Sequence, residues 1–155
     1  PQEIMIREVQ YYLPYPGVLP DSKLYVLKMV RDKVSLWTIL DGEKKARKEL
    51  LYADKRINAA MFLLDGGKET LAVTTATKGE KYLESSINRA AKLSKEGKDT
   101  KSLLATLVTA SAKHLELLDV LQAKATGARK DVIVTVVEST KVAHENAEQA
   151  LLEAK

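Results

Sequence analysis

No proline occurs in residues 21–155, although the first twenty residues contain all four prolines of the chain, Pro1, Pro14, Pro16 and Pro20. Proline inside a helix costs about 3 kcal/mol, because it removes a backbone hydrogen bond and clashes with the preceding turn. A proline-free stretch of this length can form long uninterrupted helices, and its abundant Ala, Leu, Lys and Glu favour them. We therefore predict an all-α fold.

Glycine-containing segments divide this region and predict where the helices end. They are DGE at 41–43, DGGK at 65–68, EGKDT at 96–100 and TGAR at 126–129. Glycine just past one helix, followed by a polar residue that opens the next, is the usual punctuation. The intervals predict five helices, near 22–40, 43–65, 68–95, 99–126 and 128–154. Asp21 or Ser22 is expected to cap the first helix.

Apolar and small residues recur at alternating steps of three and four, the spacing of helices packed at the shallow angle of a bundle. In the second helix they are Ala46, Leu50, Ala53, Ile57, Ala60 and Leu64. In the third they are Ala72, Ala76, Gly79, Leu83, Ser86, Ala90 and Leu93, and the small residues among them would let a partner helix approach closely. Because the connections are short, residues 22–155 are expected to form an antiparallel up-down bundle of four to five long helices. Trp37 and Phe62 are predicted to anchor its core.

The segment VIVTVV at 132–137 has the β-branched composition of a strand. The helical alternation nevertheless continues through it, from Ile133 and Val137 to Thr140 and His144, and the sequence has no second strand candidate. The propensity difference is under about 1 kcal/mol per residue, so the periodicity decides for helix.

Residues 1–21 combine the prolines with tyrosines and predict an extended N-terminal arm, since each residue before a proline is pushed toward extended geometry. Tyr11, Tyr12 and Tyr15 are expected to lie across a groove between helices, burying their rings and leaving the hydroxyls in water. The alternative is that these tyrosines, together with Leu19 and Tyr25, form an exposed docking surface for a partner chain.

The sequence has no signature of an enzyme or of nucleic-acid recognition. Without cysteine there are no thiolate metal sites or cysteine nucleophiles, and neither GxSxG nor HExxH occurs. The net charge of +4 permits weak attraction to anions, but the densest basic stretch, 44–48, has no interleaved aromatic residues and no base-reading motif. We expect no enzymatic activity, no cofactor and no specific nucleic-acid partner. No apolar run reaches the roughly 20 residues that span a bilayer, so membrane attachment would need a segment outside this chain.

His114 and His144 fall on the stripes of the fourth and fifth predicted helices. A turn near residue 128 would bring them within about 3 Å of each other along the bundle axis, with Ser111 and Thr140 nearby. This pattern predicts a small polar layer inside the bundle. A metal site would combine His114, His144 and Glu148, but zinc sites usually supply three or four ordered ligands, so hydrogen-bonded histidines are the expectation.

The segments LPYPGVLPDSKLYVLKMVRDKV (13–34) and KKARKELLYADKRINAAMFLLDGGK (44–68) resemble a bacterial family of exported helical domains of unknown function. Members of that family carry an LPxxPLYxLK-like motif, then a helix with an A-x-x-R-L core and a glycine stop. The matching positions are Leu19, Pro20, Leu24, Tyr25, Leu27, Lys28, Ala53, Asp54, Arg56, Ile57 and Gly67. Lys23 stands in place of a second proline and Ile57 in place of leucine. The resemblance covers the first 70 residues well and the remainder loosely.

The resemblance implies a domain outside the cytoplasm, anchored by an N-terminal hydrophobic segment, with no established activity or cofactor. The chain begins at Pro1 and not at methionine, which fits removal of such a segment. We expect a non-enzymatic scaffold or protein-interaction domain of the cell envelope or extracellular space. It would self-associate or bind another protein through the arm or the small-residue face of the third helix. The alternative is a bundle that senses a ligand or ion at its histidine layer.

Overall fold

The computed structural model describes residues 8–154, and within them the chain forms five α-helices and no strand. The helices are α1 (Tyr25–Thr38), α2 (Gly42–Asp65), α3 (Glu69–Lys95), α4 (Lys101–Lys124) and α5 (Gly127–Glu153). The predicted all-α fold is confirmed, and the segment at 132–137 is helical as part of α5. Residues 1–7 of the predicted arm lie outside the described residues.

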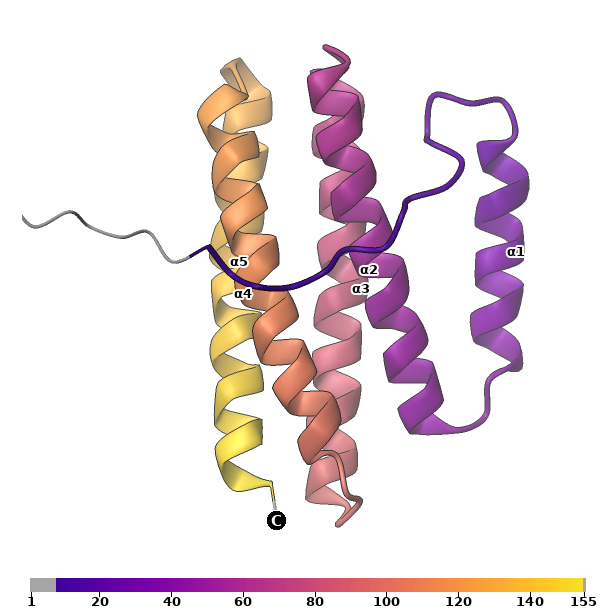
Figure 1. Ribbon diagram of the computed structural model, residues 1–155, viewed down its shortest axis with the longest axis vertical. Helices are drawn as coiled ribbons and strands as arrows, with labels where there is room; N and C mark the ends of the chain where they lie inside the picture. The colour runs from indigo at the N-terminus through magenta and orange to yellow at the C-terminus, as the bar shows by residue number, and fades with distance from the viewer. Residues whose placement is uncertain (1–7, 155) are drawn as a thin grey trace, which may run out of the picture.

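Helices α2 to α5 form an antiparallel bundle (Figure 1). α3 packs against α2, α4 and α5, while α4 packs against α2, α3 and α5. α3 and α4 are therefore the pair that every other bundle helix contacts, and α2 and α5 flank them. A side chain from α3 or α4 can for this reason reach partners on three other helices.

The small residues of α3 face α2, where the two backbones come close together. A Cβ added at Gly79 would lie 3.0 Å from the Cβ of Arg56 and 3.3 Å from the carbonyl oxygen of Ala53. Further toward the C-terminus of α3, at the same contact with α2, the hydroxyl of Ser86 donates to the carbonyl of Ala46 at 2.7 Å. The predicted close approach is confirmed, but α2 of the same chain occupies this face. The expectation that it binds another chain is therefore wrong.

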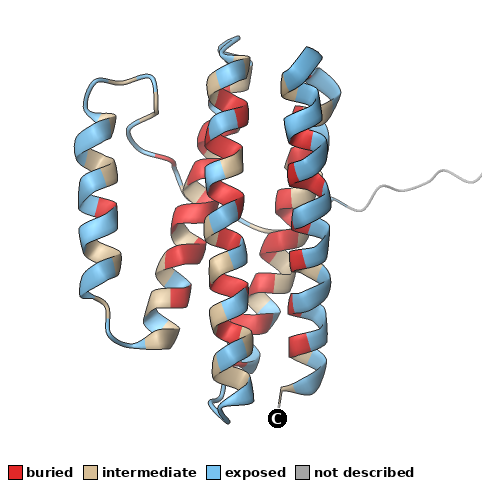
Figure 2. Cartoon of the chain, turned by 180° about the vertical axis from the view of Figure 1, so that it is seen from behind, coloured by how far each residue is buried: buried red, intermediate tan, exposed pale blue. Residues whose placement is uncertain are grey.

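The apolar core of the bundle consists of two halves. One half contains Ala46, Leu50, Ala53, Leu83, Ile87, Ala90, Leu103, Leu104, Leu107, Ala110, Ala143, Ala147 and Ala150. The other contains Ile57, Ala60, Leu63, Ala72, Val73, Ala76, Leu118, Leu121, Ile133, Val136 and Val137. These residues lie on the inner faces of the helices (Figure 2). Between the halves lie Asp54, Glu80, Ser111, His114 and Thr140, all buried, which we call the polar layer.

Helix α1 lies beside the bundle and contacts only α2 among the described helices (Figure 1). Asp32 is its only buried residue. Trp37 lies on the side of α1 where no helix packs, and Phe62 lies on the outer side of α2, next to inward-facing Leu63. Both are exposed, so their prediction as core anchors is wrong. The bundle has four helices, with α1 as a fifth helix outside it.

The start of α1 also differs from the prediction. The helix begins at Tyr25, three residues later than expected, with no side-chain cap at Leu24. Asp21 instead forms an ion pair with Lys68 at the start of α3, and the Ser22 hydroxyl accepts from the backbone N–H of Leu24 at 3.3 Å within a turn. The two predicted capping side chains are therefore used to shape and hold the connection between the arm and α1.

Candidate functional site

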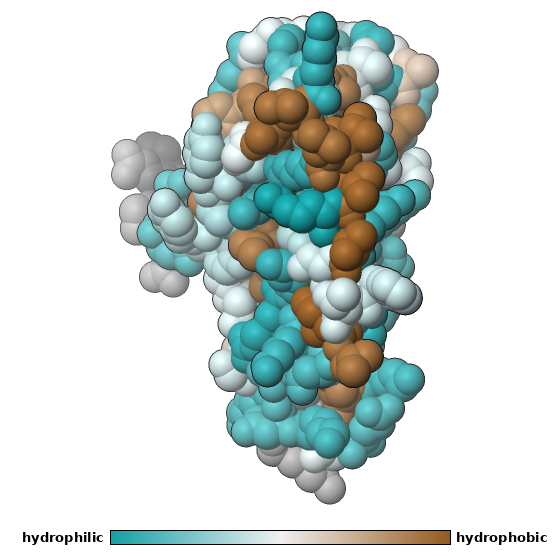
Figure 3. Space-filling model, turned by 90° about the vertical axis from the view of Figure 1, so that its right-hand side faces the viewer, coloured by the Kyte–Doolittle hydropathy of each residue, from teal (hydrophilic) through white to brown (hydrophobic). Residues whose placement is uncertain are grey.

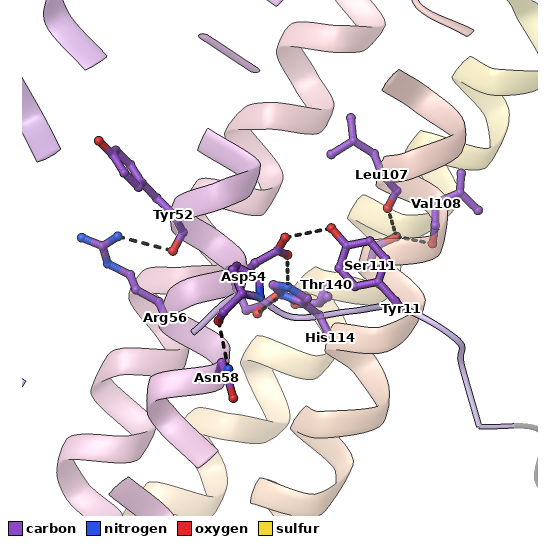
Figure 4. A network of polar contacts seen from close by, with 12 residues as sticks. Tyr11, Tyr52, Asp54, Arg56, Asn58, Leu107, Val108, Ser111, His114 and Thr140 are labelled. Atoms are coloured by element: carbon purple, nitrogen blue, oxygen red, sulfur yellow. Dashed lines mark hydrogen bonds and ion pairs between the residues drawn. The ribbon is translucent and has the colours of Figure 1, made fainter. Parts of the chain in front are cut away.

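The polar layer joins all four helices of the bundle through one buried histidine (Figure 4). Nε2 of His114, on α4, donates to Oδ1 of Asp54 on α2 at 3.0 Å. Nδ1 of His114 donates to Oε1 of Glu80 on α3 at 2.8 Å. Thr140, on α5, donates to Oε2 of the same glutamate at 3.1 Å. The imidazole thus bridges two carboxylates, and one carboxylate carries the link on to the fourth helix.

The N-terminal arm extends this network by one residue. The hydroxyl of Tyr11 donates to Oδ2 of Asp54 at 2.8 Å, so both oxygens of that carboxylate are occupied. The Tyr11 ring packs against one half of the core and Leu13 against the other, so the arm spans the polar layer from outside. Asn58 on α2 donates to the carbonyl of Pro14 at 3.0 Å, and Glu116 on α4 accepts from the backbone N–H of Val9 at 2.9 Å. The arm is fastened to α2 and α4, which it crosses in Figure 1.

Of the three tyrosine rings predicted to lie against the helices, only that of Tyr11 does so, and its hydroxyl binds Asp54 where the prediction left it in water. Tyr11 is half-buried and hydrogen-bonded, whereas Tyr12 is 89% exposed and Tyr15 is 74% exposed. Leu19 and Tyr25 are half-buried, and Nζ of Lys28 lies 5.6 Å from the centre of the Tyr25 ring. Tyr12 points away from the helices because the side chains on either side of it, Tyr11 and Leu13, face them. This alternation ends at Pro14, and beyond it Pro16 is buried while Tyr15 is exposed.

The charge state of His114 follows from its two carboxylate partners. Burial on its own would lower the pKa of His114, but the charge of Glu80 and the hydrogen bonds to Asp54 and Glu80 outweigh it and raise that pKa from 6.5 to about 9. At neutral pH the ring is therefore an imidazolium that donates from both nitrogens. Burial, together with the charge of Asp54, raises the pKa of Tyr11 above its ordinary value, so its hydroxyl remains a donor.

The second histidine sits at the edge of the bundle. Nδ1 of His144 lies 2.7 Å from the hydroxyl of Ser111, which itself donates to the carbonyl of Leu107 at 2.7 Å. Its Nε2 lies 3.5 Å from a carboxylate oxygen of Glu148. The histidines thus have separate partners, as expected for hydrogen-bonded side chains. Across residues 8–154, no group of three or more His, Asp or Glu is arranged to hold a metal ion.

The polar layer has little chemistry open to it, because both nitrogens of His114 already donate hydrogen bonds. A doubly protonated imidazole has no lone pair with which to accept a proton or bind a metal. The layer joins helices and arm, and removing His114 would leave the buried charges of Asp54 and Glu80 unpaired. Sequence reasoning placed His114, Ser111 and Thr140 in this layer. It did not place the two carboxylates, Asp54 and Glu80, in the layer.

Sequence reasoning also did not find a row of exposed apolar side chains on α1. Val26, Leu27, Val30, Val34 and Trp37 project from one side of α1 and are 52–81% exposed; we call this surface the outer face of α1. Figure 3, which looks onto the α1 side of the molecule, shows hydrophobic side chains running along it beside hydrophilic ones. Steps of three and four from Leu27 to Trp37 were the available signal. A second stripe, which contains Met29, Asp32 and Leu36, obscured it because that stripe is the one that faces the bundle.

These features define an all-α domain: a four-helix bundle with a buried polar layer, a fastened arm and one helix outside. The chain matches, over residues 17–155, the family model described as Domain of unknown function (DUF5667), and it belongs to this family. The expected membership of a family of unknown function is confirmed, and the match covers all five helices. No curated protein and no solved structure matches the chain. In the described part of the chain, no helix has both the length and the hydropathy needed to span a bilayer.

Proposed function

We propose that this domain is a non-enzymatic helical scaffold that binds a partner protein through the outer face of α1. The supporting observation is a row of five large apolar side chains, all more than half exposed, on one side of a 14-residue helix. Single exposed apolar residues are common, but a contiguous apolar patch on a protein surface usually marks an interaction site.

The spacing of the outer face suits a helical partner. Leu27, Val30, Val34 and Trp37 follow steps of three and four, the pattern of a helix that lies in the groove of another. α1 contacts the bundle through the side opposite the outer face, so a partner could dock without displacing the helix.

The charges around the outer face favour an acidic partner. At 100° per residue, Arg31 and Lys33 flank the apolar stripe on either side, and exposed Lys23 precedes it. Asp32, the acid of α1, is buried and accepts from the Arg31 guanidinium at 2.8 Å. Two copies of α1 would bring basic flanks together, whereas an amphipathic helix with Asp or Glu on its flanks would pair with them. We therefore assign the face to a partner of that chemistry and not to a second copy of α1.

The rest of the domain supports α1 in this role. Nζ of Lys28 donates to the carbonyls of Pro16 and Val18 at 2.6 and 3.0 Å, which ties α1 to the arm. The arm in turn is fixed to the polar layer through Tyr11. A bacterial origin, a location outside the cytoplasm and membrane attachment through a segment outside this chain are proposed on the resemblance of residues 13–34 and 44–68 alone.

Trp37, the only tryptophan of the chain, lies on the outer face and reports its burial directly. A synthetic amphipathic helix with leucines on one side and glutamates on both flanks should shift the Trp37 emission to shorter wavelength in a saturable manner. Val30→Asp should abolish the shift. Val142→Asp is the matched control, because Val142 on α5 is 56% exposed and Val30 is 57% exposed.

A lysine-flanked version of the peptide should bind more weakly, since its charges oppose those of α1. A peptide that binds wild type and Val30→Asp equally would contradict the proposed surface. A blue shift that appears with protein concentration alone, and is lost in Val30→Asp, would assign the face to a second copy. A shift with anionic vesicles but not with the peptide would assign it to a membrane.

A further inference from the structure

A cleft lies between the inner side of α1 and the bundle, separate from the outer face. Its volume is about 420 Å³, and its lining includes Met29 and Lys33 from α1, Arg56 from α2, and Lys78, Lys81 and Tyr82 from α3. Small-molecule sites commonly measure about 300–1,000 Å³ and combine apolar walls with a few polar groups, so the cleft has the size and composition of such a site.

Arg56 is a buried cation whose donors are largely unused. The residue is 9% exposed, and its Nε has no hydrogen-bond partner among the described residues. Its Nη1 donates to the carbonyl of Tyr52 at 3.4 Å, a long contact. Arg56 takes part in none of the ion pairs formed by residues 8–154. A buried guanidinium without a carboxylate partner is costly, which calls for an anion at this position.

The surroundings orient the guanidinium without neutralising it. Its central carbon lies 4.5 Å from the centre of the Tyr82 ring and 5.9 Å from that of Tyr52. Contacts of this kind with aromatic rings fix the orientation of the guanidinium plane. They leave the N–H groups at its edge available to a second partner.

One acidic residue, Glu49, lines the cleft itself, and both it and the buried Asp32 of α1 already have partners. Glu49 accepts from the Arg89 guanidinium at 3.0 and 3.1 Å and from the Ser85 hydroxyl at 3.0 Å. Asp32, on the inner side of α1, accepts from Arg31 at 2.8 and 3.2 Å. The remaining charged groups of the cleft are Arg56 and three exposed lysines, all positive.

We propose that this cleft binds a small oxyanion, a carboxylate or phosphate group, with Arg56 as its main hydrogen-bond donor. Guanidinium groups bind both oxyanions through two parallel N–H bonds. Lys78 and Lys81 attract the ligand from the open side, and the Met29 and Tyr82 side chains provide an apolar wall for an organic portion of it. Lys33 borders both surfaces, but the main donor Arg56 belongs to α2, so this proposal can be tested independently of the partner proposed for the outer face.

The test measures binding of inorganic phosphate, phenyl phosphate and benzoate to the whole chain by calorimetry. At least one of these ions should bind saturably, and the aromatic ions should bind more tightly than inorganic phosphate if the apolar wall is used. Arg56→Met keeps much of the side-chain volume and removes the charge, and it should weaken binding about tenfold or more, the contribution of one charged hydrogen bond. Lys130→Gln, an exposed lysine of α5, should leave binding unchanged.

Circular dichroism establishes whether Arg56→Met folds. If it does not fold, the double variant Lys78→Gln and Lys81→Gln, on the exposed rim of the cleft, replaces it in the test. This variant should also bind the ions more weakly than wild type. Vesicles with anionic phosphate headgroups, compared with free phenyl phosphate, distinguish a lipid source from a soluble one. No saturable binding of any ion up to about 10 mM would overturn the proposal, as would equal binding by wild type and the charge-deleted variants.

Discussion

His114 donates to Asp54 across the bundle at 3.0 Å, and this bond joins α4 to α2 at the level where the two halves of the apolar core meet. Its second nitrogen binds Glu80, so one imidazolium is shared by carboxylates from two helices. Apolar packing is non-directional, whereas this network is satisfied only when α2, α3, α4 and α5 have one register. We infer that the polar layer fixes the register of the bundle.

Replacing His114 by alanine should be strongly destabilising. The substitution leaves Asp54 and Glu80 buried without their cation, and removing one partner of a buried ion pair typically costs about 3–5 kcal/mol. Urea denaturation followed by circular dichroism gives the free energy of unfolding. His144→Ala, at the edge of the bundle, is the control and should cost under about 1 kcal/mol. Equal losses for the two variants would show that the layer is not the stabilising element.

The stability of the domain should fall on the alkaline side of neutrality. The pKa of His114 is raised in the folded state to about 9 from 6.5, so its contribution is fully present below pH 6.5 and is lost as the pH rises through about 9. One proton accounts for a slope of at most about 1.4 kcal/mol per pH unit. Asp54, Glu80 and Thr140 face the ring, and the Tyr11 phenol beside Asp54 stays protonated in this window because its own pKa is raised.

Unfolding free energies measured at pH 6, 7.5 and 9.5 check this slope. His114→Gln, which cannot titrate, should show a flatter profile over the same range even though it is less stable throughout. If wild type and His114→Gln lose stability in parallel, another group is responsible for the alkaline loss.

The sequence predicted the fold closely because each clue was local. Glycine stops and the absence of proline define α2 to α5, and the stripes through His114 and Thr140 place polar residues at one level. Glu80 could not be found in this way. It precedes Lys81 in a run of charged residues that resembles a solvated surface, and the packing of α4 and α5 against α3 buries it. Burial of a charge depends on the partner helix, which the sequence of one helix does not contain.

Helix α1 was misplaced for a related reason. Its apolar residues occupy both sides, with Met29 and Leu36 toward the bundle and Val30, Val34 and Trp37 toward solvent. A helix with apolar residues on two sides normally packs between neighbouring elements. The arm passes between the polar layer and α1 and ties α1 down through Lys28, and this arrangement is visible only in three dimensions.

Gly79→Ala should separate α2 from α3. The new methyl group would lie 3.0 Å from the Cβ of Arg56 and 3.3 Å from the carbonyl of Ala53, too close to fit without movement of the backbone. Overpacking of this kind costs about 1–3 kcal/mol, which outweighs the gain in helix propensity of about 1 kcal/mol. Thr74→Ala, at an exposed position of α3, provides the comparison in thermal unfolding. An increase in midpoint for Gly79→Ala would mean that the two helices adjust without strain.

Tyr11→Phe and Tyr12→Phe form a matched pair that tests how the arm is fastened. Both remove one hydroxyl from neighbouring residues of the same segment, but only the hydroxyl of Tyr11 reaches Asp54, at 2.8 Å, while Tyr12 projects into solvent. Loss of a hydrogen bond to a charged acceptor costs about 1.5–3 kcal/mol, so Tyr11→Phe should lower the free energy of unfolding by roughly that amount and Tyr12→Phe should leave it unchanged.

The arm should also open locally, and proteolysis within residues 8–24 should accelerate in the Tyr11 variant before the bundle unfolds. The remaining contacts through Asn58 and Glu116 are to backbone groups and are unaffected by either change. Equal cleavage rates in the two variants would therefore show that these backbone contacts, and not the link to the polar layer, hold the arm in place.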